Sequence, residues 1–202
     1  MRLYALSDDH FTPHIRLFDS IKALINAGVD LIQYRSKQGA HDLELLSRIC
    51  EYARLHKVDF IINDDALLAK EVGASGVHIG KDDGGVLRAR EILGKGATIG
   101  ASCYNDINLA LKAQEQGASY VAFGSVFASA TKPNAVRCDL SVISKAKELV
   151  SVPVCAIGGI DASNIALLKN AGANWAAIVR ACYEPCSIEQ NIKMLANALK
   201  YA

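Results

Sequence analysis

The feature that most constrains the fold is a short pattern that occurs four times. In each copy, a segment with helical periodicity ends at a glycine, and a small or branched residue, a short polar residue and an apolar run follow. The copies begin at Gly28, Gly73, Gly117 and Gly172, at intervals of roughly 45 to 55 residues. Glycine suits the position just after a helix because it adopts left-handed backbone angles without a Cβ clash. The apolar run has the length of a strand buried on both faces. The pattern therefore predicts four helix–glycine–strand units.

Four further strands are predicted between these copies, at residues 2–7, 58–63, 97–102 and 152–158. Helical periodicity fills the intervening segments, as at 42–56 and 108–117. Strand and helix alternate eight times in 202 residues, and about 25 residues per unit is close to the minimum for a (β/α)₈ barrel. We therefore predict an α/β protein with one TIM-barrel domain over residues 1–202 and an active site at the C-terminal strand ends. An open doubly wound sheet is the alternative, but no GxGxxG motif follows the first strand.

The balance of charge argues against a broad nucleic-acid-binding or anionic-membrane surface. Lysine plus arginine is 22 and aspartate plus glutamate is 21, so the formal net charge is +1. The apolar stretches fall far short of the roughly 20 residues that span a bilayer, and the N-terminal segment lacks the apolar core of a signal peptide. We expect a cytoplasmic protein without nucleic-acid or membrane partners, and a homo-oligomer is compatible with the sequence.

The six cysteines and five histidines do not suggest a metal site. Neither a CxxC pair nor an HExxH spacing occurs in the sequence. A disulfide framework is untypical of a chain this long and this apolar, so we expect the cysteines to act as small buried hydrophobes.

Cationic and polar residues follow the second predicted strand. Gln33, Arg35 and Lys37 alternate along the chain, so strand geometry predicts that they share one face. Buried cations without partners are costly, so we expect an anionic ligand or acidic partners near the mouth of the barrel. A solvated salt-bridge ladder on a loop is the alternative. Three alternating polar residues at one strand end favour a binding site.

Carboxylates follow the next two strands. The third predicted strand ends at Asn63 and runs into Asp64, and the fourth leads to Asp83. Carboxylates at neighbouring strand ends can jointly hold a hard cation such as Mg²⁺, with substrate phosphate at other positions. Each aspartate taken singly is more typical of a helix N-cap. Their position beside Arg35 and Lys37 favours a metal and phosphate site.

Hydroxyl groups, glycines and further cations follow the later strands. Ser102 ends the strand at 97–102, and the loop after the next strand offers phosphate contacts at Ser129, Thr131 and Lys132. Gly158 and Gly159 are predicted to open a helix near Asp161, where backbone N–H groups approach a phosphate. A tight turn is the alternative for the glycine pair.

Arg180 follows the last predicted strand. It either clamps a phosphate with two hydrogen bonds or points outward and pairs with Glu184. The sequence leaves both interpretations open.

Six stretches together resemble the thiamine phosphate synthase family over nearly the whole chain, from Tyr4 to about Arg180. They are LIQYRSK at 31–37, FIIND at 60–64, GVHIGKDD at 76–83, IGAS at 99–102, VAFGSVFASATK at 121–132 and AIGGI at 156–160. The resemblance implies a transferase that joins an aminopyrimidine methyl diphosphate to a thiazole phosphate. Diphosphate leaves in a Mg²⁺-dependent substitution.

The resemblance also implies roles for single residues. The diphosphate or pyrimidine-side contacts are Arg35, Lys37, Asn63 and Lys132, and the Mg²⁺ ligands are Asp64 and Asp83. Polar contacts near the reacting groups are Ser102, Thr131 and Ser129, the last standing where a threonine is usual. Gly159 matches a backbone contact to the thiazole phosphate, and Asp8 matches an acidic strand end without a stated role. Lys132, Arg35 and Ser102 are the expected catalytic groups.

This sequence departs from the family pattern at several positions. Lys81 stands in place of a glutamine, Tyr104 in place of a histidine, and Gly84 and Gly85 in a region that commonly holds proline. Arg180 replaces a small hydroxyl residue. A thiazole tautomerase of the same fold and a non-catalytic barrel that binds phosphometabolites are the alternatives. The diphosphate-binding set favours the synthase.

Overall fold

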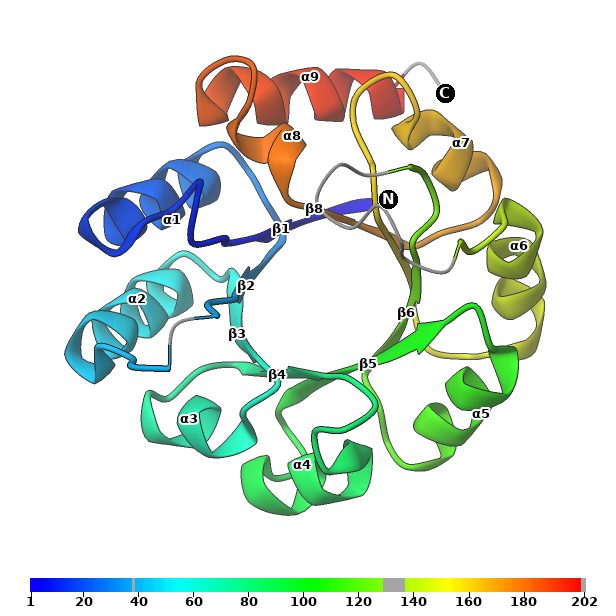
Figure 1. Cartoon of the computed structure of the whole chain (residues 1–202), viewed down its shortest axis with the longest axis horizontal. Helices are drawn as coiled ribbons and strands as arrows, with labels where there is room; N and C mark the ends of the chain where they lie inside the picture. The colour runs from blue at the N-terminus through cyan, green and yellow to red at the C-terminus, as the bar shows by residue number, and fades with distance from the viewer. Residues whose placement is uncertain (38, 129–136, 201–202) are drawn as a thin grey trace.

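The computed structural model describes residues 1–37, 39–128 and 137–200, which form a closed parallel barrel inside a ring of helices (Figure 1). The strands are β1 (Arg2–Leu6), β2 (Leu31–Tyr34), β3 (Asp59–Asn63), β4 (Gly76–Ile79), β5 (Thr98–Tyr104), β6 (Tyr120–Gly124), β7 (Val154–Ile157) and β8 (Trp175–Ile178). Each strand pairs with the next, and β8 pairs with β1. The (β/α)₈ prediction is confirmed, and the open sheet is excluded.

Helices cover the outside of the barrel (Figure 1). They are α1 (Leu17–Asn26), α2 (Leu43–Leu55), α3 (Ala66–Glu71), α4 (Gly85–Leu93), α5 (Ile107–Glu115), α6 (Leu140–Leu149), α7 (Ile165–Asn170), α8 (Arg180–Tyr183) and α9 (Ile188–Lys200), with a 3₁₀ helix, η1 (His14–Arg16), before α1. The helices predicted at 42–56 and 108–117 correspond to α2 and α5. Among the described helices, none is long and apolar enough to cross a bilayer.

The four repeat glycines have the backbone angles that the sequence predicts. The φ angles are +90° at Gly28, +69° at Gly73, +90° at Gly117 and +89° at Gly172. Each glycine lies just beyond the C-cap residue of α1, α3, α5 or α7. A left-handed residue at this position ends the helix and turns the chain back toward the barrel. The repeat therefore marks the helix-to-strand turns.

Two layers of apolar side chains hold the barrel. The larger layer lies between the strands and the helices and includes Ile21, Ile49, Phe60 and Phe123. The smaller one fills the interior of the barrel and consists of Tyr4, Leu6, Leu31, Ile61, Tyr120, Ala122, Cys155 and Ala177. Five cysteines are buried as expected, whereas Cys186 is exposed. The interior is thus packed with side chains, as is usual for this fold.

A chain of polar contacts runs through the interior of the barrel. The hydroxyl oxygens of Tyr4 and Tyr120 are 2.9 Å apart, and the Tyr120 oxygen is 2.8 Å from Nδ1 of His78. Nε2 of His78 is 2.9 Å from Oγ of Ser102. Burial raises the pKa of both tyrosines well above the ordinary value for tyrosine. Burial also lowers the pKa of His78 to about 4. All members of the chain are therefore neutral at physiological pH.

The repeat glycines allow a test of the turn geometry. Gly28 and Gly96 both have open space where a Cβ atom would lie, but only Gly28 of the two has a left-handed φ. Gly28→Ala should therefore lower the free energy of unfolding by about 1–2 kcal/mol, because the cost is purely conformational. Gly96→Ala, the matched control, should stay within about 0.5 kcal/mol of the wild type. Urea unfolding measures both, and equal losses in the two variants would contradict the assignment.

The buried imidazole of His78 should make stability depend on pH. Its pKa is about 4 in the folded protein and 6.5 ordinarily, so the unfolded chain takes up the proton first as the pH falls. The contribution of the neutral ring is complete above about pH 6.5 and is lost between about pH 6.5 and 4.

The measurement compares the free energy of unfolding of the wild type with that of His78→Gln, which does not titrate. The stability of the wild type relative to the variant should decrease as the pH falls from about 7.5 to 5. Other groups that titrate in both proteins cancel in the difference. A difference that is constant over this range would show that the ring is not held neutral by the fold.

Candidate active site

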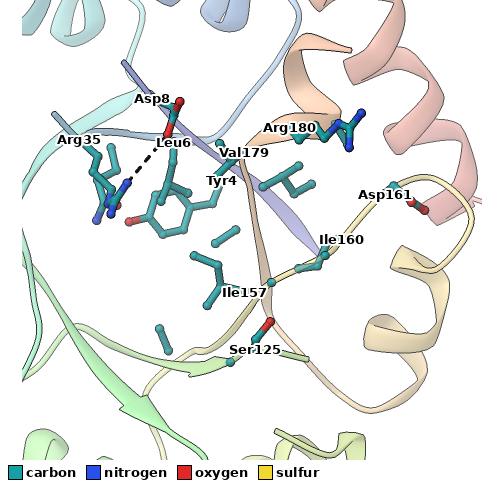
Figure 2. Close-up of a pocket in the computed structure, with 18 of the residues that line it drawn as sticks. Tyr4, Leu6, Asp8, Arg35, Ser125, Ile157, Ile160, Asp161, Val179 and Arg180 are labelled. Carbon is teal, nitrogen blue, oxygen red and sulfur yellow. Dashed lines mark ion pairs between the residues drawn. The ribbon is translucent and has the colours of Figure 1, made fainter. Parts of the chain in front are cut away.

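A pocket of about 1040 Å³ opens at the C-terminal ends of the strands. Every strand contributes at least one lining residue or is followed directly by one. Figure 2 shows Asp8 and Arg35 on one side of the pocket and Ile160, Asp161 and Arg180 on the other. The predicted site residues that line it are Gln33, Arg35, Asn63, Ser102, Gly159 and Arg180. Ser129, Thr131 and Lys132 lie outside the described residues.

Hydrogen bonds and an ion pair join the ends of β1 and β2 beside the pocket. Oγ of Ser7 accepts a hydrogen bond from the backbone N–H of Arg35 at 2.8 Å and donates to its carbonyl oxygen at 3.2 Å. Nη1 of Arg35 lies 3.9 Å from Oδ2 of Asp8, and the two side chains are 25% and 18% exposed. The Asp8 carboxylate thus gives the guanidinium of Arg35 a fixed partner across the strand ends (Figure 2). The family resemblance matches Asp8 without a role, and the structure places it beside Arg35.

Gln33 and Lys37 occupy different environments. The Gln33 side chain is 1% exposed, and its Nε2 atom lacks a hydrogen-bond partner within the described part of the chain. A buried donor without a partner is costly, and its place in the pocket wall suits it to a ligand acceptor. Lys37 is exposed and does not line the pocket. The predicted shared face ends early because β2 stops at Tyr34, so strand alternation does not extend to Lys37.

Two carboxyl groups meet beyond β3 and β4. Burial, and then the hydrogen bond and charge of Asp83, raise the pKa of Asp64 to about 6, while Asn63 and Arg35 oppose the increase. Nδ2 of Asn63 donates to Asp64 at 2.5 Å, and the backbone N–H of Gly80 donates to Asp83 at 2.7 Å. Asp64 also has a φ of +66°, an unfavourable angle for a residue with a Cβ atom. The fold therefore brings two acidic groups together at some cost.

Helix capping does not account for this pair. The N-cap of α3 is the neighbouring Asp65, whose side chain accepts the N–H of Leu68 at 2.8 Å. The N-cap of α4 is Gly84. The pair instead fits a hard cation, since Mg²⁺ is typically held by one or two carboxylates together with water and substrate phosphate. No group of three or more candidate ligands from histidine, cysteine, aspartate and glutamate is found among the described residues.

The glycine pair after β7 forms a tight turn against the loop that follows β6. The φ angles are +108° at Gly158 and +63° at Gly159. A Cβ atom on Gly158 would overlap Ser125, and one on Gly159 would overlap the carbonyl oxygen of Ala128. The glycines are therefore required by packing, and Gly159 also lines the pocket.

The helix predicted to open near Asp161 begins later in the structure. Residues 161–164 form a turn in which Oδ1 of Asp161 accepts the N–H of Ser163 at 2.8 Å, and α7 starts at Ile165. The aspartate side chain binds the backbone locally, and the turn that results delays the start of the helix. Nδ2 of Asn164 donates to the carbonyl oxygen of Gly159 at 2.9 Å.

Arg180 opens α8 and pairs with Glu184. Its Nε atom lies 2.8 Å from Oε2 of Glu184, and the two side chains are 65% and 43% exposed. Both residues line the pocket, and Figure 2 shows the guanidinium directed away from Arg35 and Asp8. This is the outward pairing that the sequence left open. An exposed pair of this kind contributes about 0–1 kcal/mol, so a stronger anion can replace the glutamate.

Two further features of the pocket were missed or unexplained in the sequence. His78 lines the pocket through its place in β4, where strand alternation turns it inward. A polar residue inside an otherwise apolar strand was the available signal. Tyr104 lines the pocket beside a register shift in β5, with a φ of +56°.

Comparisons with known proteins agree with this geometry. The family model described as thiamine monophosphate synthase matches residues 3–182. The chain is 41% identical to the thiamine-phosphate synthase of Nitrosococcus oceani, covering 90% of this chain and 85% of that protein. It is 42% identical to the enzyme of that name from Thioalkalivibrio sulfidiphilus, covering 96% and 93%. A solved thiamine phosphate pyrophosphorylase from Pyrococcus furiosus superposes with a TM-score of 0.88 at 28% identity, covering 99% and 96%. The chain therefore belongs to the thiamine monophosphate synthase family.

Proposed function

We propose that the protein is a thiamine-phosphate synthase that joins an aminopyrimidine methyl diphosphate to a thiazole phosphate and releases diphosphate. The observation that carries the proposal is the carboxyl pair Asp64–Asp83, with the charge of Arg35 close enough to favour the ionised form of Asp64. The guanidinium of Arg35 can bind phosphate oxygens, and the two carboxyl groups can bind a metal ion. The site therefore suits a ligand that brings both. The identity of the two substrates rests on the family resemblance, and the similarity to thiamine-phosphate synthases supports it.

The reaction exchanges one bond at the methylene carbon of the pyrimidine. The bond to the diphosphate oxygen breaks, and its electron pair leaves with the diphosphate. The thiazole nitrogen donates its lone pair to the same carbon and becomes positively charged. The electron-rich aminopyrimidine stabilises the charge that develops on the carbon between these events, so a protein nucleophile is not required.

The chain contributes binding and charge stabilisation on the diphosphate side. Arg35, oriented by Asp8, binds diphosphate oxygens, and Asp64 and Asp83 would hold Mg²⁺. When bound, Mg²⁺ neutralises part of the charge on the leaving diphosphate. Gln33 and Asn63 offer amide groups to the pyrimidine side. Lys132 and Ser102 complete the set by family resemblance, whereas Lys37, which has the same assignment by resemblance, does not line the pocket.

The thiazole phosphate is proposed to bind at the opposite side of the pocket. The turn at Gly159 brings the backbone close to the cavity, and Arg180 lies at its rim. TIM barrels commonly bind phosphate after the seventh and eighth strands. Ser129 and Thr131 are assigned to polar contacts near the reacting groups by resemblance alone.

Incubation of the purified protein with both substrates and Mg²⁺ tests the proposal. Thiamine phosphate, identified by mass, is the expected product, and it should be absent when either substrate is omitted. Binding of both substrates without product would instead favour the non-catalytic barrel. Rearrangement of the thiazole without the pyrimidine substrate would favour the tautomerase.

Removal of either proposed metal ligand should abolish most Mg²⁺-dependent turnover. We expect Asp64→Ala and Asp83→Ala each to lose about 100-fold in rate at limiting Mg²⁺, because each removes one of two carboxylates. Asp65→Ala is the matched control. It removes the N-cap of α3, so it should cost about 1 kcal/mol of stability and leave turnover intact. Wild-type turnover by either ligand variant at limiting Mg²⁺ would exclude that residue from the metal site.

The Arg180–Glu184 pair allows a two-sided test of the thiazole phosphate site. Arg180→Ser should weaken thiazole phosphate binding about tenfold, because a charged hydrogen bond contributes about 1.5–3 kcal/mol. Glu184→Gln should leave binding unchanged or tighten it, since the variant frees the guanidinium. Titration calorimetry measures both affinities, and inhibition by free diphosphate should not change in either variant. Equal or tighter binding by Arg180→Ser would show that the arginine obstructs the pocket.

A further inference from the structure

The polar chain inside the barrel has two ends with different surroundings. Tyr4 and Tyr120 are 2% and 0% exposed, and the Tyr4 hydroxyl contacts no other hydrogen-bonding group than that of Tyr120 within the described residues. Ser102 is partly exposed and lines the pocket. The row of hydrogen-bonded side chains therefore starts at Tyr4 in the closed interior and ends at Ser102 in the pocket.

The number of hydrogens on these four side chains restricts which group donates in each hydrogen bond. Two tyrosine hydroxyls, one N–H of the neutral imidazole and one serine hydroxyl share three contacts. If Nδ1 of His78 carries the hydrogen, this N–H donates to the hydroxyl oxygen of Tyr120, so the Tyr120 hydroxyl cannot donate to Nδ1. One of the two buried tyrosine hydroxyls then has no acceptor.

The other tautomer satisfies every buried donor. The Tyr4 hydroxyl donates to the Tyr120 oxygen, the Tyr120 hydroxyl donates to Nδ1 of His78, and Nε2–H of His78 donates to Oγ of Ser102. Only the Ser102 hydrogen remains, and it lies at the end of the chain that faces the pocket. A buried donor without a partner costs more than an unused lone pair, so this direction is favoured.

We propose that His78 is a positioning residue that fixes Ser102 as a hydrogen-bond donor toward an anionic oxygen bound in the pocket. This assignment rests on the proposed function only in naming that oxygen as one of the diphosphate. Diphosphate oxygens accept hydrogen bonds and do not donate them. A serine whose hydrogen was taken by His78 would present only lone pairs to the ligand and would repel it.

The tautomer of His78 can be measured without substrate. In ¹⁵N NMR spectra at neutral pH, a ring nitrogen that carries hydrogen is readily distinguished from one that does not. The His78 signals are assigned by their absence from His78→Gln. Hydrogen on Nε2 is the expected result, and hydrogen on Nδ1 would overturn the proposal. This measurement remains decisive even if the protein shows no synthase activity.

The effect on turnover separates positioning from simple packing. His78→Leu removes the donor to Ser102 and should lower kcat by about tenfold or more, with little change in KM for thiazole phosphate. His78→Gln places an amide N–H near the position of Nε2 and should recover most of the loss. His56→Leu is the matched control at the exposed C-cap of α2 and should keep the wild-type kcat.

Circular dichroism confirms that each variant is folded before its rate is compared. Equal losses in His78→Leu and His78→Gln, or no loss in His78→Leu, would overturn the positioning role.

Discussion

The pairing of β8 with β1 is the interaction on which the pocket depends. Parallel strands all end at the same edge of a sheet, and closure bends that edge into a ring. Arg35 after β2, Ser102 in β5 and Gly159 after β7 thereby surround one cavity, although they lie far apart in the chain. In an open sheet the same residues would be spread along a line.

Several unfavourable contacts lie in the pocket wall or directly beside it. Gln33 keeps a buried amide without a partner, Asp64 combines a left-handed backbone with an acidic neighbour, and Tyr104 has a left-handed φ as well. The interior below them is different, because its polar chain is satisfied from Tyr4 to Ser102. A fold tolerates such costs where a ligand offsets them, which fits the proposed binding of anions and a metal ion.

The sequence predicted most of the fold because its signals are local. The four repeat glycines needed only their helix ends, and the apolar runs needed only strand length. The site was less predictable where distant residues decide it. Lys37 follows the alternation of β2 in the sequence but lies beyond the end of that strand. His78 obtains its partners from β5 and β6, and Asp8 obtains its role from Arg35, 27 positions along the chain. No local pattern encodes these contacts.

The close packing of the glycine turn has a consequence for how this pocket can evolve. Because a side chain on Gly158 would displace Ser125, one mutation there alters two loops at once and selection will resist it. Arg180 is held by a single exposed pair, so it can be replaced without disturbing its neighbours. A substitution at Arg180, after β8, therefore disturbs fewer neighbours than one in the glycine turn. The family resemblance places a departure of this chain, an arginine where a small hydroxyl residue is usual, at this same position.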